Sequence, residues 1–477
     1  MIEKRNFYID GKWVAPHSAR AMDVIDPSTE ETCAVISIGD DTDTNKAVAA
    51  AKAAYPAWSA TEPAVRLAYV EKILEIYKRR EKEMGELISL EMGAPIDMAI
   101  SSQATSGTWH IENFIEAFKT FEFIRPVGPH APQSRLAHQP VGVVALITPW
   151  NWPMNQVTLK VIPALLAGCT MILKPSEIAP LSSLLFAEIV DEAGVPAGVF
   201  NLVNGDGAGV GAQLSSHPDV EMVSFTGSTR AGTAITIAAA ATMKKVALEL
   251  GGKGANLIFA DADANAVKRG VRHCFNNSGQ SCNAPTRMLV ERPVYDQAVE
   301  IARQVAEETG VASAHQNGKH IGPVVSEAQY EKIQGLISKG MEEGARLVAG
   351  GPGRPAGLNR GYFVRPTVFA DVTPGMTIEK EEIFGPVLSI LPFDTEEEAL
   401  SIANDTQYGL TNYVQTQDPA RRNRLALALR AGMIETNGVS LGAGTFFGGV
   451  KSSGRAREGG HWGIEEFLDS KMISEWA

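Results

Sequence analysis

Apolar residues recur along this chain at two different spacings. Over residues 62–92 they follow a helical period and end at Gly93 and Pro95, which predicts one long helix with a stop signal. The segment FYIDGKWV near the start instead has short apolar runs on either side of Asp10-Gly11, which predicts a hairpin. The N-terminal part of the chain is therefore predicted to contain both a β-hairpin and a long helix.

From about residue 140 to 250, short β-rich runs alternate with helical segments. We expect strands at VGVVALIT, TMILKP, GVFNLV and VEMVSFTG, and helices that begin near Pro180, Gly207 and Ser228. A second alternating block covers about 252–440, with strands expected at ANLIFA, RMLVE, GYFVRPTVF and VLSILPF. Alternation of this length favours βαβ units and parallel sheets, so the pattern predicts two α/β domains with small flanking segments. The tail after Gly454 is expected to be helical or extended.

Length and charge narrow the class of protein. The 477 residues are enough for about three domains. A net charge of −12 argues against nucleic acid or an anionic membrane surface as partner. The longest apolar stretches, around 157–173 and 234–243, are interrupted and too short to span a bilayer. The N-terminus has no uninterrupted apolar core of a signal peptide, so we expect a cytoplasmic protein.

The four cysteines are widely spaced and include no CxxC pair. They are Cys33, Cys169, Cys274 and Cys282. This usage suits a reducing compartment and argues against both a disulfide framework and a zinc site, so we expect no metal.

Cys282 differs from the other cysteines because it ends a small, polar stretch, FNNSGQSC (275–282). It stands 33 positions after Glu249 of LELGGK. A thiol in a polar turn and a carboxylate on another turn are the nucleophile and base that covalent acyl chemistry needs. The alternative is a buried structural cysteine, which is the commoner role of a free thiol. The pair alone does not decide between them.

Two strand–glycine–helix junctions compete as a pyrophosphate site. One contains Gly207-x-Gly209-x-x-Ala212, which matches the Ala-ended dinucleotide fingerprint, and the pattern alone slightly favours it. The other is VSFTGSTRAG (223–232), where a helix opens directly after a strand. A third element, ILKPSE (172–177), offers the ammonium of Lys174 and the carboxylate of Glu177, which suit an adenosine ribose, although in isolation such a segment is more often a solvated charged loop.

Seven motifs occur together in the order and spacing of the aldehyde dehydrogenase superfamily, which the chain resembles over essentially its whole length. They are PWNWP (149–153), LKPSE (173–177), FTGSTRAG (225–232), LELGGK (248–253), GQSC (279–282), EEIFGPV (381–387) and FGGVKSSG (447–454). The resemblance is to the NAD(P)-dependent, non-acylating members. It implies an α/β fold with a Rossmann-type cofactor domain, an α/β catalytic domain and a small oligomerisation arm.

The implied domain bounds follow the same motifs. Residues 1–120 and 141–250 would form the NAD-binding domain, and residues 251–455 the catalytic domain. Residues 121–140 and 456–477 would be bridging segments that extend across a partner in a homodimer or homotetramer. An exposed strand edge that adds to a neighbouring sheet fits both segments.

The resemblance also implies roles for five catalytic residues. Cys282 would attack the aldehyde carbon to give a thiohemiacetal, with Asn151 and the backbone N–H of Cys282 as oxyanion donors. Departure of hydride to the nicotinamide leaves a thioester, which water activated by Glu249 hydrolyses. Lys160 and Glu458 match positions that some members use to carry protons away from the base; as bare residues they would more often be surface charges.

For the cofactor, the resemblance reverses the preference of the pattern and places the phosphates at Gly227–Ser228. It favours NAD over NADP because the Glu177 carboxylate accepts hydrogen bonds from ribose hydroxyls and repels a 2′-phosphate. Glu382 and Phe384 match the residues that hold the nicotinamide ribose and ring. The full set of expected cofactor contacts is Thr148, Pro149, Trp150, Lys174, Ser176, Glu177, Phe225, Gly227, Ser228, Leu250, Glu382 and Phe384.

The substrate tunnel implied by the resemblance is lined by Trp152, Asn155, Gln156, Leu159, Ser281, Asn283, Thr445, Phe446 and Phe447. Two buried amides, Asn155 and Gln156, favour a small-molecule aldehyde with polar groups over a long alkyl one, because an unpaired buried amide costs about 1–3 kcal/mol. No Arg lies in these stretches to pair with a substrate carboxylate, and Val450 stands where many members have an aromatic residue.

Two other functions remain open at this level. A CoA-acylating relative would pass the acyl group to CoA, and a silent binding protein would keep the fold without turnover. The retention of Glu249 argues for water as the acceptor, and the joint presence of Cys282, Glu249 and Asn151 argues against a silent protein.

Overall fold

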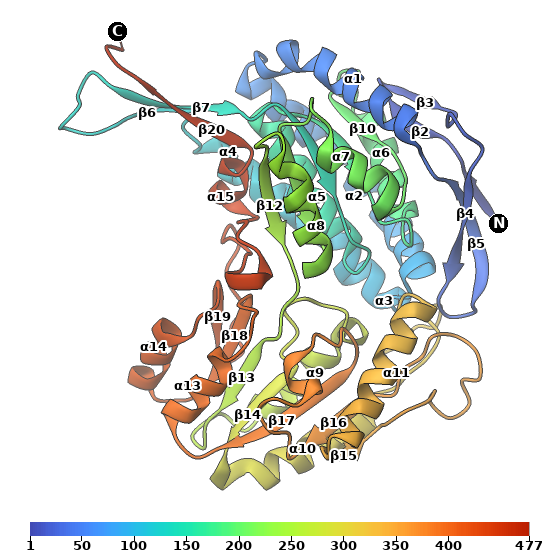
Figure 1. The fold of residues 1–477 in the computed structure, drawn as a ribbon, viewed down its shortest axis with the longest axis vertical. Coiled ribbons are helices and arrows are strands. Elements are labelled where there is room, and N and C mark those ends of the chain that lie inside the picture. The colour runs from blue at the N-terminus through green and yellow to red at the C-terminus, as the bar shows by residue number, and fades with distance from the viewer. Residues whose placement is uncertain (477) are drawn as a thin grey trace.

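Two seven-stranded sheets form the framework of the molecule, which Figure 1 shows as a computed structural model that describes residues 1–476. The first sheet has the order β12-β11-β8-β9-β10-β2-β3. Its strands are β2 (Phe7–Ile9), β3 (Lys12–Val14), β8 (Val143–Ile147), β9 (Thr170–Lys174), β10 (Phe200–Leu202), β11 (Met222–Thr226) and β12 (Lys245–Glu249). The five strands from β12 to β10 pair in parallel, and the predicted hairpin β2–β3 adds to the β10 edge in antiparallel pairing.

Helices cover both faces of this sheet, because alternate strand residues point to opposite sides. Val143 and Ala145 pack with α1, α7 and α8, whereas Val144 and Leu146 pack with α2, α4, α5 and α6. The helices are α1 (Asp41–Ser59), α2 (Pro63–Met92), α3 (Ile96–Met98), α4 (Thr105–Lys119), α5 (Pro153–Ala167), α6 (Leu181–Glu192), α7 (Ala212–Ser216) and α8 (Thr229–Ala240). The predicted long helix is α2, which ends at Gly93 in the left-handed conformation (φ 83°).

The second sheet has the order β15-β16-β17-β14-β13-β18-β19 and lies in the lower half of Figure 1. Its strands are β13 (Ala255–Ile258), β14 (Arg287–Glu291), β15 (Arg346–Ala349), β16 (Thr367–Ala370), β17 (Val387–Phe393), β18 (Thr411–Gln415) and β19 (Met433–Thr436). The helices here are α9 (Ala266–Phe275), α10 (Tyr295–Glu308), α11 (Glu327–Glu342), α12 (Thr377–Lys380), α13 (Glu396–Asn404) and α14 (Pro419–Ala428). All pairs except β15–β16 are parallel.

Two small sheets flank this framework. One has the order β1-β5-β4, from Ile2–Lys4, Glu31–Ser37 and Ala21–Asp26. The other has the order β20-β7-β6, from Leu468–Ile473, Arg135–Pro140 and Ile124–Pro126, and Figure 1 shows it projecting from the body with the C-terminus beside it. The two segments expected to bridge to a partner thus pair with each other within one chain, and α15 (Gly460–Glu465) leads into β20.

Some elements differ from the sequence pattern. The helix expected at Gly207 is a π-helical turn, Gly207–Gly211, followed by the five-residue α7. In GYFVRPTVF only Thr367–Ala370 is strand, because the N–H of Tyr362 donates to Pro27 and Pro366 has no N–H to give. Strands β12, β18 and β19 were not predicted from the pattern of apolar and polar residues. No helix within residues 1–476 is long and apolar enough to cross a bilayer.

Candidate active site

Cys282 follows a turn with an unusual backbone. Asn277 (φ 52°), Ser278 (φ 56°) and Gly279 (φ 73°) are left-handed in succession. A non-glycine residue held in this region costs about 1–3 kcal/mol, so the surrounding structure must hold the turn. Only glycine fits position 279, because a Cβ there would lie 2.1 Å from the carbonyl oxygen of Gly385.

Buried polar side chains hold this turn in place. Gln103 Nε2 donates to Asn277 Oδ1 (3.0 Å), and Ser278 Oγ donates to the carbonyl of Gly322 (2.8 Å). Gln280 Oε1 accepts from the N–H of Val325 (2.9 Å). Buried hydrogen bonds of this kind make the turn rigid, so the nucleophile is presented in one position.

Asn151, in the loop after β8, is bound to the same turn. Its Nδ2 donates to the carbonyl of Gln280 (3.0 Å), and its own carbonyl accepts from Asn277 Nδ2 (3.0 Å). An amide nitrogen carries two hydrogens, so one remains for a developing oxyanion. Asn151 and Cys282 both line each of the two cavities described below.

Glu249 is the last residue of β12 and is buried. Neither of its carboxylate oxygens has a hydrogen-bond partner among the described residues. Burial and the nearby carboxylate of Glu458 raise its pKa well above the ordinary value, while Lys160 opposes that shift. A Cβ at Gly448 would lie 3.0 Å from Glu249 Oε1, so a larger residue at this position would crowd the carboxylate.

Lys160 of α5 and Glu458 form a buried ion pair, with side chains 1% and 7% exposed. The alternative that both are surface charges is therefore wrong. Two charges are taken out of water only at a cost of several kcal/mol each, which mutual pairing offsets. The pair supplies a polar connection beside Glu249, although its use as a proton relay stays a prediction.

One cavity, of about 230 Å³, lies on the side of Cys282 toward the first sheet. Glu382 Oε1 accepts from the N–H of Gly252 (2.8 Å), and a Cβ at Gly251 would lie 2.3 Å from Glu382 Oε2. Trp150 and Phe384 meet edge to face at 5.5 Å. The expected cofactor residues that line this cavity are Pro149, Trp150, Gly227, Ser228, Leu250, Glu382 and Phe384, and Gln329 and Lys332 join them.

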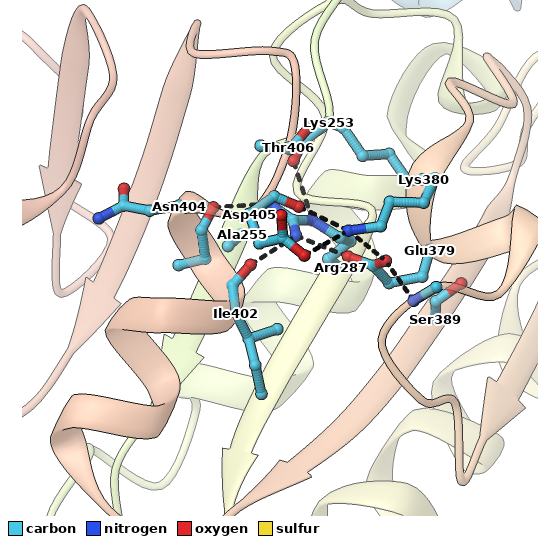
Figure 2. A network of polar contacts seen from close by, with 12 residues as sticks. Lys253, Ala255, Arg287, Glu379, Lys380, Ser389, Ile402, Asn404, Asp405 and Thr406 are labelled. Atoms are coloured by element: carbon cyan, nitrogen blue, oxygen red, sulfur yellow. Dashed lines mark hydrogen bonds and ion pairs between the residues drawn. The ribbon is translucent and has the colours of Figure 1, made fainter.

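A buried network anchors the LGGK loop between the two sheets, as Figure 2 shows. Arg287 of β14 donates from Nε to the carbonyl of Lys253 (3.0 Å) and pairs with Glu379 (2.9 Å). Its other nitrogens donate to the carbonyls of Ile402 and Ala403 (both 3.0 Å). The loop that carries Gly251 and Gly252 past Cys282 is thus tied to the second sheet.

The expected adenosine end lies at the carboxyl edge of the first sheet. Lys174 Nζ donates to Glu177 Oε2 (3.0 Å) and to the carbonyl of Pro175 (2.9 Å). Three other expected cofactor residues, Thr148, Ser176 and Phe225, are buried. The carboxylate of Glu177 is partly exposed and therefore accessible to a ribose.

The GxGxxA loop is occupied by its own side chain. Asp206 caps the π-helical turn and accepts from the N–H of Gly209. A carboxylate at this position repels a phosphate, whereas the corresponding cap at Gly227–Ser228 is a neutral hydroxyl that accepts from Ala231 (3.2 Å). The loop is nevertheless close to the adenosine end, since a Cβ at Gly211 would lie 3.9 Å from Lys174 Cδ.

The second cavity, of about 420 Å³, opens from the other side of Cys282. All nine residues expected to line a substrate tunnel line it: Trp152, Asn155, Gln156, Leu159, Ser281, Asn283, Thr445, Phe446 and Phe447. The remaining wall of this cavity contains none of the motifs named above. That wall comes from α4, α9 and the segment around β19, with Ser106, Trp109, His110, Asn113, His273, Asn276, Met433, Glu435, Ser440 and Leu441 among its residues.

The two tunnel amides have different surroundings. Asn155 Oδ1 lies 2.6 Å from His110 Nε2, and burial lowers the pKa of His110 to about 4, so the neutral ring donates to the amide. Gln156 Oε1 is buried without a hydrogen-bond partner among the described residues. Trp152 Nε1 donates to Ser281 Oγ (2.8 Å), which orients the indole beside the nucleophile. The Asn155 oxygen thus has a hydrogen-bond donor, whereas the Gln156 oxygen has none among the described residues.

The surroundings of Cys282 keep its thiol protonated. Burial raises its pKa, and the carboxylates of Glu382 and Glu249 raise it further. The backbone hydrogen bond at Cys282 opposes these shifts by lowering the pKa.

Comparison with known proteins agrees with this site. The model of the aldehyde dehydrogenase family matches residues 13–473. A 3-succinoylsemialdehyde-pyridine dehydrogenase of a Pseudomonas species is 49% identical over 99% of both chains. The crystal structure of an aldehyde dehydrogenase from Bartonella henselae is 63% identical and covers 100% of both chains with a TM-score of 0.99.

A second structure carries ligands. It is aldehyde dehydrogenase C of Pseudomonas syringae, a cysteine-to-alanine mutant in complex with NAD+ and octanal. It is 46% identical, covers 99% of this chain and 97% of that chain, and has a TM-score of 0.97. The chain described here belongs to the aldehyde dehydrogenase family.

Proposed function

We propose that this enzyme oxidises an aldehyde to the carboxylic acid with NAD, through a thioester on Cys282 that water hydrolyses. One observation carries the proposal. Cys282 and Asn151 are the residues shared by the two cavities, and the unpaired carboxylate of Glu249 is buried close to the thiol, whose pKa it raises. An aldehyde in one cavity and a nicotinamide in the other would thus meet at one sulfur.

In the acylation half, the Cys282 thiol releases its proton to water and the sulfur forms a bond to the aldehyde carbon, while the electrons of the C=O bond move to the oxygen, which gains the negative charge. The free N–H of Asn151 and the backbone N–H of Cys282 stabilise this oxyanion. Removal of one such donor typically costs about 3–4 kcal/mol in the transition state. The rigid turn at 277–279 holds both donors ready, so no reorganisation is needed when the charge develops.

The cofactor side fits a nicotinamide nucleotide. Glu382, held by the N–H of Gly252, would accept from ribose hydroxyls, and Phe384 with Trp150 would bound the ring. Gly227 and Ser228 open α8 with a neutral cap and suit a pyrophosphate, while Lys174 and Glu177 suit the adenosine ribose. When bound, NAD supplies the acceptor for the hydride that leaves the substrate carbon.

In the deacylation half, Glu249 takes a proton from a water molecule that attacks the thioester carbon, and the C–S bond breaks to release the acid. A base with a raised pKa is suited to this step near neutral pH, because it gains more from binding the proton. Lys160 and Glu458 form the polar connection through which the proton would leave. Glu249 makes water, rather than CoA, the acceptor.

For the substrate, we propose a polar aldehyde, since two amide residues, Asn155 and Gln156, line the tunnel and Gln156 Oε1 has no hydrogen-bond partner among the described residues. The Pseudomonas relative, by its name, acts on a semialdehyde that carries a pyridine ring, which is consistent with such a tunnel. The octanal in the P. syringae structure shows that a relative's tunnel also takes an alkyl chain. The choice therefore depends on side chains particular to this protein.

The same proposal covers assembly and compartment. The β20-β7-β6 sheet leaves β20 and β6 as edges, and we propose that a homodimer or homotetramer forms through this arm. The four cysteines are free, which supports a reducing, cytoplasmic location.

NADH formation tests the activity. The purified protein is assayed with NAD on short, long, aromatic and polar aldehydes, with Cys282→Ala as the matched control. We expect turnover that needs Cys282 but not CoA, and kcat/KM higher for polar aldehydes. Turnover only with CoA would refute the hydrolytic mechanism, and a long alkanal that exceeds every polar aldehyde would refute the substrate class.

A further inference from the structure

Glu435 of β19 lies where the substrate cavity joins a second hollow. Both cavities are lined by Glu435, His273 and Ser440. In the parallel pairing of β18 with β19, Glu435 is in register with Tyr413, whose hydroxyl donates to the carbonyl of Asn283 (2.6 Å). Glu435 therefore lies on the side of the substrate cavity that adjoins this second hollow, which Cys282 does not line.

The Glu435 carboxylate is partly buried and unpaired. Burial is the cause that raises its pKa, and no hydrogen-bond donor or cation of residues 1–476 lowers it. A desolvated carboxylate without a partner is unfavourable unless a ligand supplies the missing interaction. The side chain that faces it across the strands, Tyr413, uses its hydroxyl on Asn283.

The other titratable groups of the substrate cavity carry no net positive charge. Burial lowers the pKa of His110 to about 4 and also lowers that of His273, so both rings are neutral. Glu458 is neutralised by Lys160. Gln156, another lining residue, has a buried Oε1 without a hydrogen-bond partner among the described residues. The cavity thus presents acceptors and one uncompensated negative charge.

Positive charge does occur in the adjoining hollow. Arg269 is paired with Asp263 (2.8 Å) and donates to Gln415 (2.8 Å). Arg272 is exposed and also lines a third cavity that does not include Cys282. Neither appears among the groups that shift the pKa of Glu435.

We propose that Glu435 is a specificity-determining residue that selects aldehydes with a positive charge at the end distal to the carbonyl. The inference rests on the proposed oxidation at Cys282. A cationic group at the tunnel end would supply the partner that the carboxylate lacks, and an anionic group would be repelled.

The test compares two isosteric substrates that differ only in charge: a straight-chain aldehyde ending in a trimethylammonium group and the same chain ending in a tert-butyl group. At alkaline pH and low salt we expect the wild-type kcat/KM to favour the cation by about tenfold, as for a partly desolvated charge pair. Glu435→Gln should abolish this ratio and leave kcat/KM for the neutral isostere within about twofold. Glu465→Gln, an exposed residue of α15, is the matched control for loss of one charge.

The outcomes separate the two proposals. A wild-type ratio of one or below, or an equal loss on both substrates in Glu435→Gln with a correctly folded variant, would overturn the role of Glu435. Cys282-dependent oxidation of the neutral isostere would still support the proposed function. Should the variant fail to fold, the wild-type ratio must decrease as salt is added, because screening weakens the charge pair; a salt-independent ratio would overturn the inference.

Discussion

The two cavities that meet at Cys282 are built in different ways. The cofactor side is shaped by close backbone approaches at Gly227, Gly251 and Gly252 and by one carboxylate that a main-chain N–H holds. The substrate side is lined mainly by side chains from α4, α5, the β19 region and the loop before α15. Substitutions on the substrate side can therefore change specificity without disturbing the cofactor, whereas changes on the cofactor side move the main chain around the nucleophile.

The largest effect on turnover is expected for Glu249, the proposed general base close to the nucleophile that both cavities share. Glu249→Gln should lower steady-state turnover about 10³-fold, within the range that a general base contributes. Acylation does not need this carboxylate, so a burst of one NADH per active site should remain. Stopped-flow measurement of NADH absorbance would record this burst. A variant without any burst would place Glu249 in the first half-reaction.

The same residue predicts a pH dependence. The carboxyl must be ionised to act, and its pKa is raised above the ordinary 4.5, so the deacylation rate should fall as pH decreases through that raised pKa rather than near 4.5. Single-turnover decay of the acyl-enzyme, followed against pH, measures this. A rate that stays constant down to the ordinary glutamate range would contradict the assigned environment.

Gly252→Ala tests the border between the cavities. A Cβ here would lie 2.2 Å from the carbonyl oxygen of Cys282, so the nucleophile turn must shift. A displacement of about 1 Å at the reacting group costs about 10²-fold in kcat. Gly335→Ala in α11 is the control, since its Cβ meets nothing within 4 Å. Equal activity of both variants would show that the turn is not held as closely as described.

On the cofactor side, Gly227→Ala should raise the KM for NAD about tenfold, because the Phe225 ring, 2.4 Å from the new Cβ, must swing into the phosphate end of the cavity. Gly207→Ala in the competing loop meets open space and should change the KM by less than about twofold. Initial rates against NAD concentration decide this. The reverse order would restore the GxGxxA loop as the phosphate site.

The smallest effect is expected on the substrate side. His110→Phe removes the donor to Asn155 and should lower kcat/KM for polar aldehydes about threefold to tenfold, as expected for one buried hydrogen bond. The KM for NAD should not change, because His110 does not line the cofactor cavity. A parallel change in both constants would contradict the separation of the two sides.

Motif residues were predictable because each serves a local requirement. Gly279 and Gly252 allow close main-chain approaches, and Cys282 ends a polar turn, so their residue types carry the information. The π-helical turn at 207–211 was not predictable as a turn, because its glycines match a fingerprint while Asp206, a capping residue, occupies the site. The glycines of the GxGxxA loop indicate a backbone with conformational freedom, but they do not identify a ligand.

The substrate wall from α4 and β19 had no sequence pattern at all. His110 and Trp109 lie on an amphipathic helix, whose pattern does not distinguish residues that line a cavity from residues of the core. Glu435 lies in a short strand of ordinary composition. Their function depends on which segments, hundreds of residues apart, end at the same cavity. Such proximity is a property of chain topology and leaves no mark on local spacing.

By itself the sequence determined the α/β alternation and the long helix α2, because periodicity acts over a few residues, whereas the nucleophile, the base and the oxyanion amide were implied by the resemblance of its motifs to a known family. The tertiary structure alone decided that Lys160 and Glu458 are a buried pair, that His110 satisfies Asn155, and that the Glu435 carboxylate is left without a partner. Burial and pairing are set by which surfaces pack together, and that depends on contacts between residues far apart in the chain.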